Sequence, residues 1–219
     1  MIGDKPDIKP IHRKLAAGIL SFIIEPVQQS GSCYAVSIAG ESGSGKSSIA
    51  EALKAELSKS GIDSLILQQD DYFVLPPITN DRTRRKDINW VGLQEVRLDL
   101  LDEHLHQSRS GKDLLTKPLV LYAEDRIITE KISLQNIKVV IAEGTYTTNL
   151  KNIDCRVFID LDYRQTKQFR DDRARDKQDE FIEQVLEIEH RIIVRHKQHA
   201  DLIITPEFSL RKNLIMKKG

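Results

Sequence analysis

The segment from Ser37 to Leu53, SIAGESGSGKSSIAEAL, constrains the fold more than any other part of the chain. An apolar run at 33–40 precedes its glycines, and apolar residues at helical spacing follow them, which predicts a buried strand, a turn and a helix. Residues of the turn fit G-x-x-x-x-G-K-[ST], the pattern of a phosphate-binding loop: Gly40, Gly45, Lys46 and Ser47. A plain glycine- and serine-rich turn is the alternative, but the position between a strand and a helix favours the phosphate loop.

The predicted loop has the chemistry of an anion site. Glycines allow its peptide N–H groups to turn inward, and the following helix directs the positive end of its dipole to the same point. We therefore expect ATP here, with Lys46 reaching the β- and γ-phosphates as a catalytic group and the Ser47 hydroxyl binding Mg²⁺. The expected nucleotide-binding residues are Gly40, Glu41, Ser42, Gly43, Ser44, Gly45, Lys46, Ser47 and Ser48.

The apolar pattern of the whole chain predicts an α/β fold. Short strands are expected at 33–40, 64–71, 139–144, 155–162 and 201–205, with helices between them. Apolar strands that alternate with helices indicate a parallel sheet covered by helices on both faces, here with five strands. We expect one domain over 1–219, in which residues 1–30 form an N-terminal helical extension.

Three other segments carry specific expectations. Residues 11–27 form an amphipathic pattern that predicts a helix ending near Pro26. Two β-rich runs within 118–134, on either side of Glu124 and Asp125, predict a small hairpin outside the main sheet. Residues 78–87 are polar and flanked by prolines, so we expect a mobile loop there.

Composition limits the class of protein. The 33 basic and 33 acidic residues balance, which argues against a general nucleic-acid-binding protein, although a local basic patch stays open. No apolar run approaches the ~18 residues of a membrane span, and LAAGILSFII continues into the fold without a cleavage site, which favours a helix over a signal peptide. The two cysteines, Cys33 and Cys155, are expected to be buried free thiols. These features predict a cytoplasmic protein without membrane or nucleic-acid partners.

Acidic residues follow two of the predicted strands. Asp70 and Asp71 end the second strand, where ligands gather in parallel α/β sheets. A carboxylate there can accept the proton of a substrate hydroxyl, although one of the two aspartates could instead cap the next turn. Glu143 ends the third strand, at VVIAEG, and is expected to bind Mg²⁺ together with Ser47 and Asp70. A strand-end carboxylate that faces water is the alternative for Glu143.

Three motifs, GESGSGKSS, QQDDYF and AEGTY, resemble in order and spacing those of the uridine kinase and phosphoribulokinase family. The resemblance covers about residues 33–205 and implies a five-stranded parallel phosphate-loop fold. It implies that Asp70 is the catalytic base and that Glu143 helps to hold Mg²⁺. It also implies that a hairpin tyrosine, Tyr122, contacts the acceptor, with Tyr72 of QQDDYF as a further acceptor contact.

The charge-rich segment 163–180 resembles the arginine-bearing lid of that family. Asp162 can cap a helix at its start, and Arg170, Arg173 and Arg175 follow. Phosphoryl transfer needs cations around the γ-phosphate, and a lid can supply them while it excludes water. A solvated, salt-bridged helix is the competing interpretation, because the arginines are interleaved with acidic residues.

The acceptor-binding motifs depart from the family. Where uridine-type members have an aspartate in an F-D-H-P-like segment, INWVGLQEV has Asn89, and Trp90 next to it is either a core residue or a stacking surface for the acceptor. We therefore expect a kinase whose acceptor is a nucleoside-like small molecule, with nicotinamide riboside or pantothenate as alternatives. A nucleotide-dependent regulatory protein without kinase activity stays open, as does a homo-oligomer.

Overall fold

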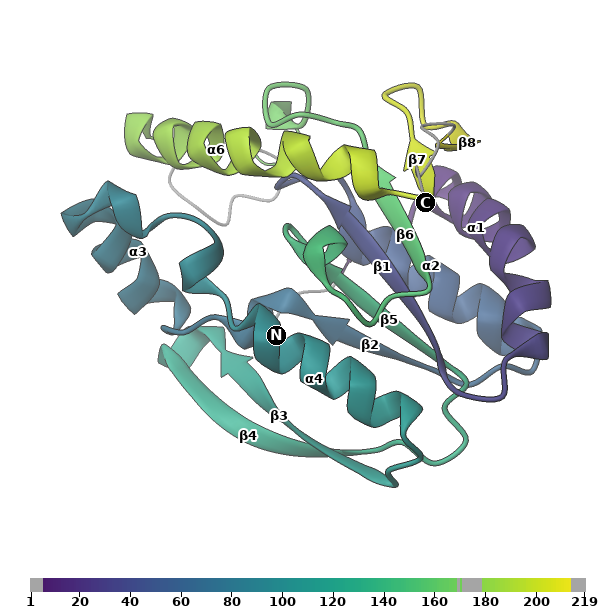
Figure 1. Ribbon diagram of the computed structural model, residues 1–219. Helices are drawn as coiled ribbons and strands as arrows, with labels where there is room; N and C mark the ends of the chain where they lie inside the picture. Colours follow the sequence, from purple (N-terminus) through teal and green to yellow (C-terminus); the bar gives the residue numbers. More distant parts are fainter. Residues whose placement is uncertain (1–5, 169, 171–178, 214–219) are drawn as a thin grey trace.

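The computed structural model describes residues 6–168, 170 and 179–213. Its central sheet has the strand order β2-β5-β1-β6-β7-β8 (Figure 1). The first five in that order pair in parallel, as predicted: β2 (Ser64–Gln68), β5 (Val139–Gly144), β1 (Tyr34–Gly40), β6 (Cys155–Ile159) and β7 (Leu202–Ile204). The sequence did not predict the sixth strand, β8 (Leu210–Lys212), which adds to β7 in antiparallel fashion.

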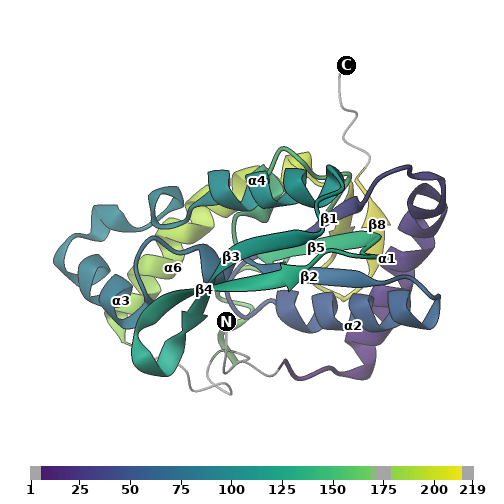
Figure 2. The same cartoon turned by 90° about the horizontal axis from the view of Figure 1, so that it is seen from below.

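Two hydrophobic clusters cover the two faces of this sheet, because successive side chains of a strand point to opposite faces. On β1, Val36 and Ile38 pack in the cluster under α1 (Pro10–Gln29) and α2 (Lys46–Lys59). Ala35 and Ala39 pack in the other cluster, with α4 (Leu98–Arg109) and the end of α6 (Glu180–Ile193). Figure 2 shows α1 and α2 on one side of the strands and α4 on the other. Both cysteines are buried free thiols, as expected.

Helix α1 continues through Pro26 to Gln29, so the prediction that it stops near Pro26 is wrong. A proline in a helix removes one N–H donor, and the cost is small in the last turn. Ile23 and Val27, on either side of Pro26, are buried in the core and hold this turn in place. In the described part of the chain, no helix has the length and apolar character needed to cross a membrane.

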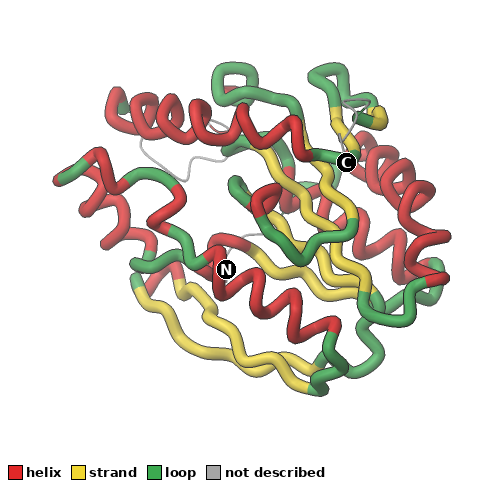
Figure 3. The backbone as a smooth tube through the Cα atoms, viewed as in Figure 1, coloured by secondary structure: helices red, strands yellow, loops and turns green. Residues whose placement is uncertain are grey.

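The segment predicted as a mobile loop at 78–87 is instead a helix, α3 (Pro77–Lys86) (Figure 3). Its first turn is capped from a distant part of the chain. The Asp125 carboxylate accepts hydrogen bonds from the backbone N–H of Ile78 at 2.7 Å and of Thr79 at 3.2 Å. These bonds satisfy N–H donors that a helix leaves without intrahelical partners. Local sequence contains no signal of this cap, which explains the wrong prediction.

The predicted hairpin exists as a separate two-stranded sheet of β3 (Leu114–Leu121) and β4 (Arg126–Ser133), and it begins earlier than residue 118. Its anchor is a buried ion pair from Lys117 Nζ to the Asp71 carboxylate at 2.8 Å. Asp125, which caps α3, lies at the hairpin's tip. The hairpin, the end of β2 and α3 are therefore joined by specific polar contacts. Of the predicted lid, Arg173 and Arg175 lie outside the described residues.

Candidate active site

The predicted phosphate loop connects β1 to α2, with the geometry that its glycines permit. Gly43 and Gly45 have φ values of 80° and 93°, in the left-handed region that favours glycine. A methyl group on Gly43 would lie 2.7 Å from Cγ of Arg170, so this arginine of the predicted lid packs directly on the loop. The Ser44 hydroxyl is buried and has no hydrogen-bond partner among the described residues. The loop therefore has the open backbone turn and an orphaned polar atom that suit a phosphate ligand.

The two charged residues of the loop, Lys46 and Glu41, form hydrogen bonds with other groups of the protein. Lys46 Nζ donates a hydrogen bond to the Glu41 carbonyl at 2.9 Å, across the loop. The Glu41 side chain accepts from the Tyr163 N–H at 2.6 Å and contacts Nδ1 of His190 at 2.6 Å. Burial raises the pKa of Glu41, and the contact with His190 opposes this effect. Glu41 thus connects the loop to α6 and to the base of the predicted lid.

Ser47 and Glu143 meet at the first turn of α2, as the metal prediction requires. Ser47 Oγ donates to Glu143 Oε1 at 3.0 Å, and only 6% of Glu143 is exposed. Burial and, to a smaller extent, the charge of Asp70 raise the pKa of Glu143 to about 7, and Lys46 opposes this shift. Among the described residues, no group of three or more His, Cys, Asp and Glu side chains could hold a metal ion. One buried carboxylate beside a serine hydroxyl suits Mg²⁺, which typically binds one or two carboxylates and completes its coordination with phosphate and water oxygens.

The adjacent aspartates in η1 (Gln69–Tyr72) have different surroundings. Asp71 is buried, bonded to Lys117 and to the backbone N–H of Val120 at 3.0 Å, and thus holds the hairpin. Asp70 lines a cavity of about 370 Å³, together with Ser42 and Gly43 of the phosphate loop. Of the two adjacent aspartates, Asp70 is therefore the one that reaches the cavity.

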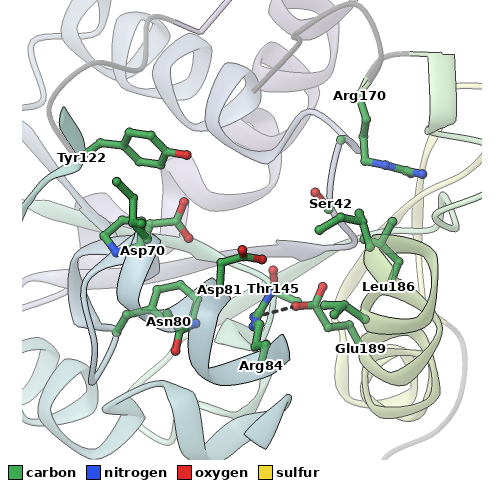
Figure 4. A pocket seen from close by; sticks show the side chains of 16 residues that line it. Ser42, Asp70, Asn80, Asp81, Arg84, Tyr122, Thr145, Arg170, Leu186 and Glu189 are labelled. Atoms are coloured by element: carbon green, nitrogen blue, oxygen red, sulfur yellow. Dashed lines mark hydrogen bonds and ion pairs between the residues drawn. The ribbon is translucent and has the colours of Figure 1, made fainter. Parts of the chain in front are cut away.

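Figure 4 shows the walls of this cavity. The hairpin contributes Tyr122, and Arg170 lines the cavity next to Gly43 of the phosphate loop. Helix α3 contributes Asn80, Asp81 and Arg84, and α6 contributes Ile182, Val185, Leu186 and Glu189. The sequence analysis identified none of the residues from α3 and α6. The only sequence signal for the α3 residues is their polar character, which was interpreted as a loop.

A buried polar network supports the wall between α3 and α6. Arg84 donates to both oxygens of Glu95, through Nε and through Nη2 at 2.9 Å, and Nη2 also reaches Glu189 Oε1 at 3.1 Å. Asn80 Nδ2 donates to Glu95 Oε1 at 2.8 Å. Glu95 lies in η3 (Leu93–Glu95) and is fully buried. The network joins segments about a hundred residues apart, and no motif indicates it.

Three predicted acceptor residues do not line the cavity. Tyr72 is fully buried, and its hydroxyl lies 2.9 Å from Nδ1 of His104. Asn89 is exposed and hydrogen-bonds to Asp87 Oδ1 at 3.0 Å. Trp90 donates from Nε1 to Asn80 Oδ1 at 2.8 Å, so it supports the cavity wall from behind. Of the predicted acceptor contacts, Asp70 and Tyr122 are the two that reach the cavity.

A parallel α/β sheet with this loop and an acidic strand end is the architecture of P-loop nucleotide-binding proteins, a class that includes phosphotransferases. Residues 35–215 match the Phosphoribulokinase / Uridine kinase family. The chain belongs to that family. It therefore has the kinase class and the P-loop nucleotide-binding site of the family.

Relatives with different acceptors match the chain. It is 30% identical over 192 residues to a uridine kinase of Mannheimia succiniciproducens, covering 79% of this chain and 86% of that protein. It is 29% identical to a bifunctional alpha-galactosidase/sucrose kinase of Mediterraneibacter gnavus, over 80% of this chain but only 20% of that much longer protein.

Solved structures share the fold. A D-glycerate 3-kinase from Cryptococcus neoformans superposes with a TM-score of 0.61 at 14% identity, covering 94% of this chain and 100% of that one. A phosphoribulokinase from Rhodobacter spheroides gives 0.62 at 10% identity, covering 80% and 71%.

Proposed function

We propose that the chain is an ATP-dependent kinase that transfers the γ-phosphoryl group to a hydroxyl of a nucleoside-like small molecule. The observation that carries the proposal is that Asp70 and the phosphate loop line the same cavity. In the proposed step, Asp70 accepts the hydroxyl proton while the acceptor oxygen bonds to phosphorus and the bond to ADP breaks. A nucleotide-dependent regulatory protein has no need of a carboxylate at that position.

The residues around the phosphate site have separate roles in this proposal. Ser47 and Glu143, with Asp70 nearby, would hold Mg²⁺, which neutralises charge on the β- and γ-phosphate oxygens. Lys46 exchanges its bond to the Glu41 carbonyl for the phosphates. Arg170, which packs on Gly43, adds a second positive charge at the end of the loop. An enzyme that consumes ATP in this way belongs in the cytoplasm.

The acceptor is the least constrained part of the proposal. Several uridine kinases among the relatives, and Tyr122 at the cavity, support a nucleoside. A free sugar is the second candidate, supported by the sucrose kinase relative and by the position of Asn89 away from the cavity. Nicotinamide riboside and pantothenate also stay in the test panel, because the position of Asn89 away from the cavity leaves the acceptor open.

The test is ADP release from ATP·Mg²⁺ with each acceptor, compared with a control without acceptor. Asp70→Asn keeps the size of the side chain but removes the proton acceptor, so we expect kcat to fall by about two to four orders of magnitude. Asp71→Asn is the matched control, because Asp71 holds the hairpin and does not line the cavity. Full activity of Asp70→Asn with any accepted substrate would refute the proposed base.

A further inference from the structure

The cavity wall opposite the hairpin carries a carboxylate with no role in the steps above. Glu189 extends from α6 into the cavity, whereas Asp70 approaches from another side (Figure 4). Its side chain is 13% exposed, so most of it is enclosed by protein. A buried carboxylate is costly unless it is paired, so its position on a cavity wall needs an explanation.

The cation beside Glu189 is Arg84, which also binds a second carboxylate. Arg84 directs Nε and Nη2 to the fully buried Glu95, and Nη2 reaches Glu189 at 3.1 Å. Two carboxylates therefore share one guanidinium. Burial raises the pKa of Glu189; Arg84 opposes this, and Glu95 adds to it. Arg84 contacts Glu95 with two hydrogen bonds and Glu189 with one, so this wall has two carboxyl groups for one cation, and Glu189 is held in a fixed place.

The other charges at the cavity reinforce this sign on the acceptor side. Asp70 adds a carboxylate, as does Asp81, which pairs with Arg85 at 2.9 Å. Arg170, the second cation among the described residues that line the cavity, donates to Thr166 Oγ1 at 2.8 Å and lies 3.5 Å from Glu183. Its side chain packs on the phosphate loop, which assigns its charge to the nucleotide end.

Carboxylates in such a wall accept hydrogen bonds from hydroxyl groups and repel anions. Charge-assisted hydrogen bonds are roughly twice as strong as neutral ones, so each aligned hydroxyl gains affinity and orientation. The neighbouring apolar side chains of Val185 and Leu186 suit the carbon face of a ring.

We propose that the acceptor is an uncharged polyhydroxylated molecule and that Glu189, held by Arg84 and Glu95, is the specificity-determining residue that accepts a hydrogen bond from one of its hydroxyls. This inference rests on the proposed kinase function and deepens it. Glu189 acts on a hydroxyl that does not react, because the reacting one faces Asp70.

The first test compares wild-type turnover of neutral acceptors (uridine, fructose and sucrose) with anionic ones (D-glycerate and ribose 5-phosphate). We expect turnover of a neutral acceptor and none of the anions above background. Preference for an anion overturns the inference but not the kinase function. Turnover of none of the acceptors overturns the inference as well, and the kinase function also fails if a wider panel gives no ADP release.

The second test is Glu189→Gln, which keeps the shape and an acceptor oxygen but loses the charge. We expect KM for the neutral acceptor to rise about tenfold, the equivalent of ~1.4 kcal/mol, with kcat and KM for ATP within about twofold of wild type. Glu189→Asp should recover part of the loss. Glu187→Gln is the control on the same helix, because Glu187 pairs with Arg191 away from the cavity.

Unchanged KM for the acceptor in Glu189→Gln overturns the assigned role. Equal changes in both KM values overturn it too, because they indicate a purely structural effect. Thermal melting of each variant checks folding. If Glu189→Gln does not fold, Glu189→Asp tests the same contact, and the wild-type comparison of neutral and anionic acceptors still decides the class of acceptor.

Discussion

The ionised Glu143 carboxylate should lower the stability of the fold while it allows Mg²⁺ to bind. The variant Glu143→Gln measures the loss of stability. The carboxyl is enclosed between β5 and α2, and burial raises its pKa from an ordinary 4.5 to about 7. The folded protein therefore holds this proton more tightly than the unfolded chain does. Stability from this group is complete below about pH 4.5 and is lost as the pH rises through about 7.

The size of the effect follows from the two pKa values. A difference of about 2.5 pH units, at ~1.36 kcal/mol each, corresponds to about 3 kcal/mol of stability lost by pH 8. Glutamine stays neutral at all pH values, and its carbonyl can still accept the hydrogen bond from Ser47. Without Mg²⁺, Glu143→Gln should therefore be more stable than wild type by up to about 3 kcal/mol at pH 8, and by little at pH 4.5.

Urea unfolding in EDTA, followed by circular dichroism at pH 4.5 and pH 8, measures this difference. Glu103→Gln, on the exposed surface of α4, is the control for loss of a charge alone. Mg²⁺ with ATP should stabilise wild type at pH 8 but have much less effect on the variant, which should also lose activity. Equal stability of the two proteins at pH 8, or a difference that does not change with pH, would refute the reasoning.

Two further changes test the loop and the cavity wall. Lys46→Ala should abolish measurable ATP binding by calorimetry while the protein stays folded, because Lys46 is a half-buried residue of the loop and not part of the hydrophobic core; wild-type affinity in a folded variant would contradict the phosphate-loop assignment. Asp125→Ala should destabilise the protein by about 1 kcal/mol through loss of the α3 cap and raise KM for the acceptor, whereas Asp125→Asn, which keeps a capping oxygen, should lose less.

Local sequence determined the phosphate site and the core. Left-handed turns at Gly43 and Gly45, and the alternation of buried residues along β1, depend on neighbouring residues, so the strands and the loop were predictable. The pairing of Ser47 with Glu143 was also predictable, because parallel strands bring their carboxyl ends to one edge of a sheet. The roles assigned to these residues in catalysis stay predictions.

Only the tertiary structure decided how the acceptor side is built. Asp125 caps α3 from the hairpin, 46 or 47 residues away in the sequence. Arg84 contacts both Glu95 and Glu189, and Glu189 lies 105 residues after Arg84. It also separated Asp70 from Asp71, because the buried Lys117 holds one and leaves the other at the cavity. Such contacts depend on how elements pack, and the residues that make them have no characteristic spacing. Short motifs therefore predicted the phosphate site. The acceptor cavity could not be predicted, because its walls depend on charged residues that are far apart in the sequence and meet only in the folded protein.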